Sequence, residues 1–343
     1  MSVVELLPRL ADGETLTREQ TRSAVTEIMG GSVDAVIVAS FLTALRVRGE
    51  TVEELAGVAS LMREEAEQID HGIKGLLDTC GTGGDGSSTF NISTATAIVV
   101  SACDVPIAKH GNRAVSSSTG SADVLRVLGV NIEVEPKINV ECLREIGLAF
   151  FFAPRWHPAM ARVMPVRRTL RFRTIFNLAG PLTNPAGADY QLVGVGRREW
   201  SDKVARALAE LGVEAATVVR GVDGLDEVTL ADNTEAILIR GGELESRVWS
   251  PESFGLPQNP NRALRVASPE ESAVVISSVL KGNKGPARNV VLANAAAALL
   301  TVGRTDDLRE GVAFAEKAID DGRALSQLEE LVRRTNREQF SAP

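Results

Sequence analysis

Near residue 73 the sequence changes from helical patterns alone to an alternation of short apolar runs and helical stretches. This change limits the possible folds, because such an alternation predicts a mainly parallel sheet covered by helices. We therefore expect an α/β protein with a small all-helical domain at residues 1–72 and a large α/β domain at residues 73–343. A helical segment near residues 165–190 is expected to complete the helical domain.

Two capping boxes mark helix starts in the first part of the chain. Thr17 with Gln20 opens one amphipathic helix, and Thr51 with Glu54 opens another. Ser32 is expected to cap the helix between them. Helices joined by such short turns pack antiparallel. A helical unit without evident chemistry is typical of a contact surface between domains or subunits.

Short apolar runs in the second part are interpreted as strands. Strands are expected at residues 75–80, 105–109, 130–134, 148–152 and 215–220. A hairpin over residues 236–249, turning at Gly241-Gly242, predicts an antiparallel edge of the sheet. The chain from Ser268 onward is expected to be helical.

The composition argues against several classes of function. The 37 basic and 45 acidic residues give a net charge of −8, which disfavours nucleic-acid and membrane-surface partners but not a locally positive anion site. No apolar run is long enough to span a membrane. The three cysteines, Cys80, Cys103 and Cys142, show neither disulfide-scaffold nor zinc-site spacing. We expect a cytoplasmic protein with reduced thiols.

A glycine-rich turn follows the first expected strand, over residues 78–85. Glycines at such a turn expose backbone N–H groups that bind phosphate oxygens. Asn91, Ser93 and Thr94 fall where a helix begins, and a helix N-terminus is itself an anion site. The glycines alone favour an ordinary strand-to-helix turn, whereas the hydroxyl-rich continuation favours phosphate binding. The spacing matches neither a Walker loop nor the dinucleotide fingerprint.

A second polar loop, Lys109-His110-Gly111-Asn112-Arg113, follows the next strand and continues through Ser116, Ser117 and Ser121. Its cations and hydroxyls suit a polyphosphate. Alone, it would be interpreted as a solvated serine loop. Two such loops at the ends of successive strands favour a ligand site, because ligands of open α/β sheets bind at the carboxyl ends of the strands.

Two further segments carry candidate chemistry. Asp226 and Glu227 follow a strand and a glycine turn, where paired carboxylates can hold magnesium; an acidic surface turn is an equally good interpretation. Arginines at 167, 168, 171 and 173 could recognise a carboxylate, although most are expected to form a solvated helix face. His157 is more typical of a packed histidine than of a catalytic base.

Taken together, these segments resemble the anthranilate phosphoribosyltransferase family in order and spacing, over nearly the whole chain. The segments that carry the resemblance are Gly81–Asp85, Asn91–Thr94, Lys109–Arg113 with Ser116 and Ser117, His157–Met160, Arg173–Asn177, Gly180–Pro185 and Asp223–Glu227. The resemblance implies transfer of the phosphoribosyl group from phosphoribosyl pyrophosphate to anthranilate in tryptophan biosynthesis. It also implies magnesium as cofactor, a fold shared with pyrimidine nucleoside phosphorylases, and a homodimer formed through the helical domain.

The resemblance also implies roles for individual residues. The implied phosphoribosyl pyrophosphate contacts are Gly81, Gly84, Asp85, Thr89, Asn91, Ser93, Thr94, Lys109, Asn112, Arg113, Ser116, Ser117 and Ser121. The implied anthranilate contacts are Gly81, Asn112 and Arg167, with His110 and His157 lining the channel. The implied magnesium ligands are Ser93, Asp226 and Glu227, and the residues expected to act in catalysis are Lys109, Asp226 and Glu227.

The chain departs from the family pattern at Arg171, where a glycine is usual, and at Arg220, where a histidine is usual. Arginine does not take a positive φ cheaply, so the turn at Arg171 is expected to differ locally. Two other functions stay open from the residues. A nucleoside phosphorylase would share the fold but use free phosphate, and a nucleic-acid-binding relative would need a basic surface and eroded donor motifs.

Overall fold

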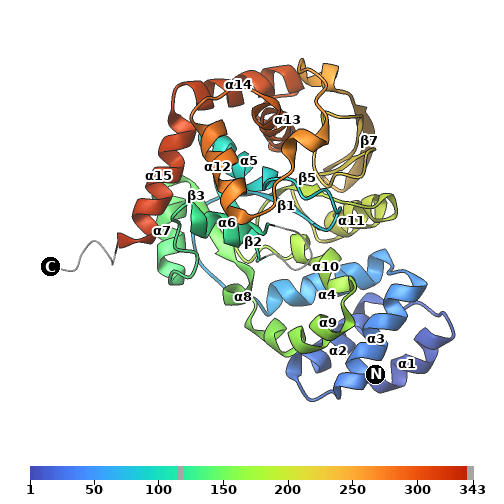
Figure 1. The fold of residues 1–343 in the computed structure, drawn as a ribbon. Helices are drawn as coiled ribbons and strands as arrows, with labels where there is room; N and C mark the ends of the chain where they lie inside the picture. Colours follow the sequence, from blue (N-terminus) through green and yellow to red (C-terminus); the bar gives the residue numbers. More distant parts are fainter. Residues whose placement is uncertain (114–118, 338–343) are drawn as a thin grey trace.

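The computed structural model describes residues 1–113 and 119–337, in a small helical part and a larger part built on one sheet (Figure 1). The N-terminal helices are α1 (Val3–Ala11), α2 (Arg18–Gly30), α3 (Ala35–Arg48) and α4 (Val52–Glu64). The capping boxes predicted at Thr17 and Thr51 are confirmed at the starts of α2 and α4. The cap predicted at Ser32 is wrong, because the Asp34 side chain accepts from the backbone N–H of Val36 at 2.8 Å and caps α3 instead.

A seven-stranded sheet forms the centre of the larger part, in the order β3-β2-β1-β4-β5-β6-β7. The strands are β1 (Leu77–Gly81), β2 (Ile107–Gly111), β3 (Leu148–Phe152), β4 (Tyr190–Gly194), β5 (Ala215–Gly221), β6 (Thr234–Arg240) and β7 (Glu243–Trp249). The first five are parallel, and β6 and β7 form the predicted antiparallel edge. The predicted fold class, a helical domain with a mainly parallel α/β domain, is confirmed.

Helices cover both faces of the sheet, and alternate residues of the central strands face opposite layers. Leu192 of β4 packs in the core formed with α5 (Ile92–Ser101) and α13 (Pro286–Thr301). The next residue, Val193, packs in the core formed with α11 (Arg198–Glu210) and the N-terminal helices. The sheet therefore lies between two apolar layers, as expected when parallel strands are buried on both faces.

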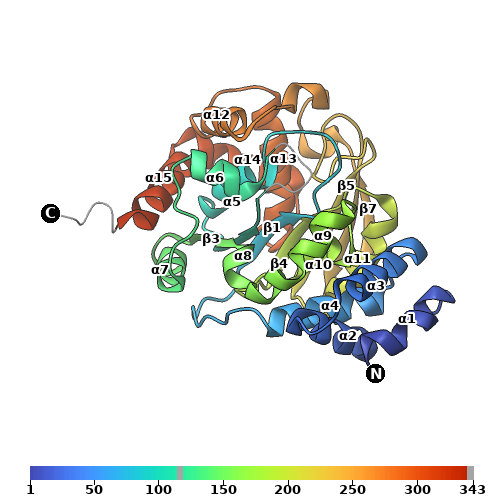
Figure 2. The ribbon, with the colours of Figure 1, turned by 60° about the horizontal axis from the view of Figure 1, so that its bottom comes forward.

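The remaining helices lie around this frame. They are α6 (Ser121–Val127), α7 (Pro136–Ile146), α8 (Ala153–Trp156), α9 (Met164–Leu170), α10 (Ile175–Ala179), α12 (Pro269–Leu280), α14 (Leu308–Asp320) and α15 (Arg323–Thr335), and short 3-10 helices span Pro158–Arg162, Gly180–Leu182, Pro251–Phe254 and Asn261–Leu264. Figure 2 shows α9 and α10 beside the N-terminal helices. In agreement, α9 contacts α3, and α10 contacts α4.

The strand predicted at residues 130–134 is wrong. Val130 and Ile132 are buried, which explains their alternating apolar pattern, but side chains satisfy the backbone there. The backbone N–H of Asn131 donates to the Thr335 hydroxyl at 3.2 Å, and that of Glu133 donates to the Asn131 side chain. The prediction also omitted β4, the central strand, and α7. Across the described ranges, no helix has the length and apolar character needed to cross a membrane.

Candidate active site

The candidate active site lies where β1, β2 and β5 end. Gly81 closes β1, Lys109 lies near the end of β2, and Asp226 and Glu227 follow β5. A Cβ at Gly194, the last residue of β4, would lie 1.6 Å from the carbonyl oxygen of Asp226. Only glycine therefore lets the carboxylate segment pack on the end of β4. This is the edge where open α/β sheets bind ligands.

Lys109 is a buried cation beneath the site, with only 3% of its surface exposed. Its Nζ donates to the Thr79 carbonyl and, at 3.2 Å, to the Ser93 hydroxyl. Asp78 and Glu227 lie near enough for their pKa values to respond to the lysine charge. Lys109 thus carries a fixed positive charge within reach of Ser93, as a site for a polyanion requires.

Asp78 is part of this site although the sequence interpretation gave it no role. Its carboxylate accepts from the backbone N–H of His110 at 3.1 Å and from the Asn184 side chain at 2.8 Å. Burial raises the pKa of Asp78 to about 6, against the opposing effect of Lys109. An acidic residue inside an expected apolar strand was the signal that could have identified it, since buried charges need partners.

The carboxyl groups of Asp226 and Glu227 are held in a desolvated, negatively charged environment. Burial, and next the charge of Asp85, raise the pKa of Asp226 to about 7. Burial and the neighbouring Asp226 raise the pKa of Glu227 well above its usual range. The backbone N–H groups of Gly83 and Ser93 partly offset these effects. A site that disfavours two carboxylates in this way favours a cation that would neutralise them.

The N-terminus of α5 brings three of the predicted donor contacts together. Asn91 caps the helix, and its side-chain oxygen accepts from the backbone N–H of Thr94 at 3.1 Å and from both the Ser93 and Thr94 hydroxyls. The Ser93 carbonyl accepts from the Thr79 hydroxyl at 3.0 Å. These bonds fix Ser93 between Lys109 and the helix start.

The glycine turn between β1 and α5 packs against the same group. Gly83 and Gly84 have φ values of +68° and +67°, a conformation that glycine takes without strain. A Cβ at Gly81 would lie 3.0 Å from an Asp226 carboxylate oxygen. Asp85 accepts from the backbone N–H of Ser87, and the Thr89 hydroxyl lies 3.4 Å from that of Ser87. The turn therefore adjoins the carboxylates.

Among the described residues, other predicted contacts of phosphoribosyl pyrophosphate make their hydrogen bonds and ion pairs with residues outside the glycine turn and the carboxylates. Arg113 pairs with Glu133 at 2.8 Å and lies over the Phe152 ring, 5.4 Å from its centroid. Asn112 is exposed, and its carbonyl accepts from the backbone of Ala122 and the hydroxyl of Ser121. The predicted contacts Ser116 and Ser117 lie outside the described residues.

Two buried histidines lie side by side near Lys109. The ring centroids of His110 and His157 are 5.3 Å apart. Burial lowers the pKa of His157 to about 4 and that of His110 well below its usual range, with His157 and Lys109 adding to the effect on His110. The Nε2 atom of each ring is buried and has no hydrogen-bond partner among the described residues. Burial therefore favours the neutral form of both rings, and each ring has one buried nitrogen without a partner among the described residues.

Arg167, on α9, is a partly buried arginine to which the described chain supplies no carboxylate partner. Its guanidinium lies over the Phe176 ring, 5.7 Å from the centroid, and approaches the Met164 sulfur at 3.6 Å. Burial lowers its pKa. A desolvated guanidinium of this kind suits a ligand carboxylate.

The two departures from the family pattern differ in their structural effect. Arg171 takes φ +55° at the C-terminal end of α9, so an arginine occupies the left-handed conformation that glycine takes more cheaply. Arg220 on β5 forms an ion pair of 3.2 Å with Glu235, the residue opposite it on β6, so its charge is neutralised within the sheet.

Sequence and structure comparisons support one family. Residues 73–325 match the model of the glycosyl transferase family a/b domain, and residues 4–66 match that of the family's helical bundle domain. The anthranilate phosphoribosyltransferase of Symbiobacterium thermophilum is 47% identical over 332 residues, 97% of each chain. The enzyme of the same name from Thermomicrobium roseum is 47% identical and covers 95% of both chains.

Solved structures agree with the sequence relatives. The crystal structure of anthranilate phosphoribosyltransferase from Thermus thermophilus superposes with a TM-score of 0.90 at 42% identity, over 96% of this chain and 99% of that one. The Saccharomyces cerevisiae enzyme in complex with PRPP and Mg gives a TM-score of 0.90 at 27% identity, over 98% of both chains. The fold, the two matched domains and the full-length relatives lead to one conclusion: the chain belongs to the anthranilate phosphoribosyltransferase family.

Proposed function

We propose that this chain transfers the phosphoribosyl group of 5-phosphoribosyl 1-pyrophosphate to the amino group of anthranilate, releasing pyrophosphate, in tryptophan biosynthesis. The observation that carries the proposal is the group of Lys109, Ser93, Asp226 and Glu227 beside the glycine turn. A fixed cation, a hydroxyl and two carboxylates are what a pyrophosphate with its metal ion needs. The names of the relatives support the choice of substrates.

The donor is proposed to bind at the glycine turn and the start of α5. The proposed contacts are Gly81, Gly84, Asp85, Thr89, Asn91, Ser93, Thr94, Lys109, Asn112, Arg113, Ser116, Ser117 and Ser121. Lys109 would stabilise the charge that develops on the departing pyrophosphate, because it is already fixed and desolvated. Arg113 would first have to leave its ion pair with Glu133.

Magnesium is the proposed cofactor, with Ser93, Asp226 and Glu227 as its ligands. The donor set fits this ion, because the Ser93 hydroxyl and the carboxylates of Asp226 and Glu227 are oxygen ligands near the buried Lys109. Magnesium prefers this arrangement, completing its shell with water and substrate phosphates. When bound, it supplies electrostatic stabilisation of the leaving pyrophosphate.

Anthranilate is proposed to bind on the α9 side, with Arg167 on its carboxylate and Gly81, Asn112, His110 and His157 around it. The neutral histidine rings suit an uncharged aryl amine. This amine needs little deprotonation before it attacks, so orientation contributes most to the rate.

The experiment is a fluorescence assay of anthranilate consumption by the purified protein. Consumption is expected only when phosphoribosyl pyrophosphate and Mg²⁺ are both present, with one pyrophosphate released per anthranilate. Each component is omitted in turn as a control. Absence of consumption under full conditions would overturn the proposed function.

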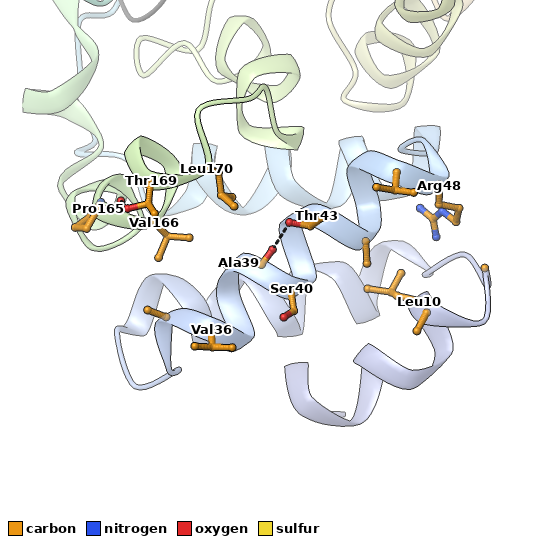
Figure 3. A pocket seen from close by; sticks show the side chains of 15 residues that line it. Leu10, Val36, Ala39, Ser40, Thr43, Arg48, Pro165, Val166, Thr169 and Leu170 are labelled. Atoms are coloured by element: carbon orange, nitrogen blue, oxygen red, sulfur yellow. Dashed lines mark hydrogen bonds between the residues drawn. The ribbon is translucent and has the colours of Figure 1, made fainter.

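We also propose that the helical domain spans residues 1–72 and is completed by a segment near residues 165–190. A homodimer is proposed to form through this domain. A groove of about 930 Å³ is lined mainly by residues of α1, α3 and α9 (Figure 3), and none of the proposed site residues lines it. Apolar side chains line it, among them Val36, Val47 and Leu170, and Val47 is 82% exposed. An open apolar surface of this kind is typical of an interface.

The dimer is tested by sedimentation of the wild type and of Val47→Glu. We expect a wild-type dimer and a monomeric variant, since a charge in an apolar interface is costly. Val274→Glu, on α12, is the matched control, because Val274 is 69% exposed but lies outside the groove. A monomeric wild type would contradict the proposal.

The three cysteines are free thiols, which supports the proposed cytoplasmic location.

A further inference from the structure

Arg173 joins the two halves of the site and has no role in the proposed function so far. It lies between α9, which carries Arg167, and Thr174, the N-cap residue of α10. Both helices pack against the N-terminal helices. The Arg173 side chain nevertheless reaches the glycine turn of the α/β part, so one short segment contacts the proposed acceptor side and the proposed donor side.

The contact with the glycine turn is close. The Arg173 Nη2 atom donates to the Thr82 carbonyl at 3.1 Å. A Cβ at Gly84 would lie 1.9 Å from the same Nη2 and 2.3 Å from the guanidinium carbon. The guanidinium therefore lies directly on the backbone of Gly84, and any larger residue there would displace it.

The charges around Arg173 are those of the proposed metal site. Asp226 and Asp85 attract its charge, whereas Arg197 and Arg46 repel it. Its guanidinium also lies over the Trp200 ring, 5.5 Å from the centroid, and Arg197 lies over the same ring at 5.1 Å. Arg173 Nη1 is buried and has no hydrogen-bond partner in the described parts of the chain. The arginine is thus held by the turn and by the charge of the carboxylates.

We propose that Arg173 is a positioning residue that holds the glycine turn in place beside Asp226 and adds its positive charge to that of Lys109 until metal and donor bind. The inference rests on the proposed function for its kinetic consequence only. It follows that the arginine competes electrostatically with a metal ion at Asp226, while it keeps the turn in place for the donor.

The test measures Mn²⁺ binding to the substrate-free protein by electron paramagnetic resonance, and KM for both substrates. In Arg173→Met we expect Mn²⁺ to bind about fivefold more tightly, because a competing cation is gone. We expect KM for phosphoribosyl pyrophosphate to rise about tenfold, and that for anthranilate to change less than about twofold. Arg173→Lys, which keeps the charge, should restore wild-type Mn²⁺ affinity.

Gly84→Ala is a second route to the same result, because its Cβ must push the guanidinium off the turn. Gly86→Ala is its matched control: Gly86 also has a positive φ, +75°, but no atom lies within 4 Å of its Cβ position. Arg197→Met controls for the contact with Trp200. Both controls should match the wild type in Mn²⁺ affinity and donor KM.

Unchanged or weaker Mn²⁺ binding in both Arg173→Met and Gly84→Ala would overturn the inference, since a purely structural arginine would give that result. A donor KM within about twofold of the wild type would also overturn it. A wild type that fails to consume anthranilate would overturn the proposed function alone, because the Mn²⁺ measurements need no substrate.

Discussion

Arg167 is the residue on which the acceptor side of the account depends. Its guanidinium is partly buried and has no ion pair among the residues that the structure describes, so a substrate carboxylate would find it free. We expect Arg167→Ala to raise KM for anthranilate at least about tenfold, with a donor KM within about twofold. Steady-state kinetics with each substrate varied measure both.

Arg168 provides the control for this prediction, because it is the next residue on α9 and is exposed. Arg168→Ala should leave both KM values near those of the wild type. An anthranilate KM that does not change in Arg167→Ala would remove Arg167 from the acceptor site.

Arg171 stores backbone strain at the end of α9. Its φ of +55° lies in the left-handed region, which costs a non-glycine residue about 1–2 kcal/mol. Glycine removes that cost but loses more entropy on folding. We therefore expect Arg171→Gly to exceed Arg171→Ala in free energy of unfolding by about 0.5–1 kcal/mol, measured in urea. An alanine variant as stable as the glycine variant would show that this turn is unstrained.

His157 makes stability depend on pH in a defined direction. Its pKa is about 4 in the folded protein and near 6.5 when unfolded, so protonation favours the unfolded chain. Stability is therefore lost as the pH falls from 6.5 toward 4. The free energy of unfolding of His157→Gln, minus that of the wild type, should be about 2 kcal/mol more favourable at pH 5 than at pH 7.5, as measured in urea. Parallel pH profiles of the two proteins would contradict this assignment.

At the scale of elements, β4 positions the carboxylates through its last residue. A methyl group at Gly194 would overlap the Asp226 carbonyl, so Gly194→Ala must shift the carboxylate segment. We expect a loss of about 1–3 kcal/mol in stability and a fall of at least about 100-fold in the magnesium-dependent rate. Gly30→Ala is the control, because no atom lies within 4 Å of its Cβ position. A Gly194→Ala protein with wild-type rate and stability would show that the end of β4 is not constrained.

Elements with a complete local signal were predictable from the sequence. The capping boxes of α2 and α4 act within four residues, and the hairpin of β6 and β7 turns at Gly241-Gly242. The pairing of β4 between β1 and β5 depends on residues far away in the chain, and its five residues include the buried polar Gln191. The strand predicted at residues 130–134 was wrong because burial of alternate residues there produces a strand-like pattern, although the segment pairs with no strand.

For the whole molecule, the sequence predicted which loops meet but not how the charges between them are balanced. Lys109, Ser93 and the carboxylates lie at one edge of the sheet, because the segments that carry them follow parallel strands and these strands end together. The contacts that Arg113 and Arg173 make in the structure were not predicted in this way. The pairing of Arg113 with Glu133, and the contact of Arg173 with the turn, arise only when distant segments fold together. The net charge of −8 likewise did not indicate an anionic substrate.

The most direct test of the central claim compares the wild type with the double variant Asp226→Asn, Glu227→Gln. The measurement is the initial rate of anthranilate consumption, with phosphoribosyl pyrophosphate present, as a function of Mg²⁺ concentration. The account predicts a wild-type rate that requires Mg²⁺ and a double variant that folds but has no magnesium-dependent rate. A double variant with the full wild-type rate and the same Mg²⁺ dependence would contradict it.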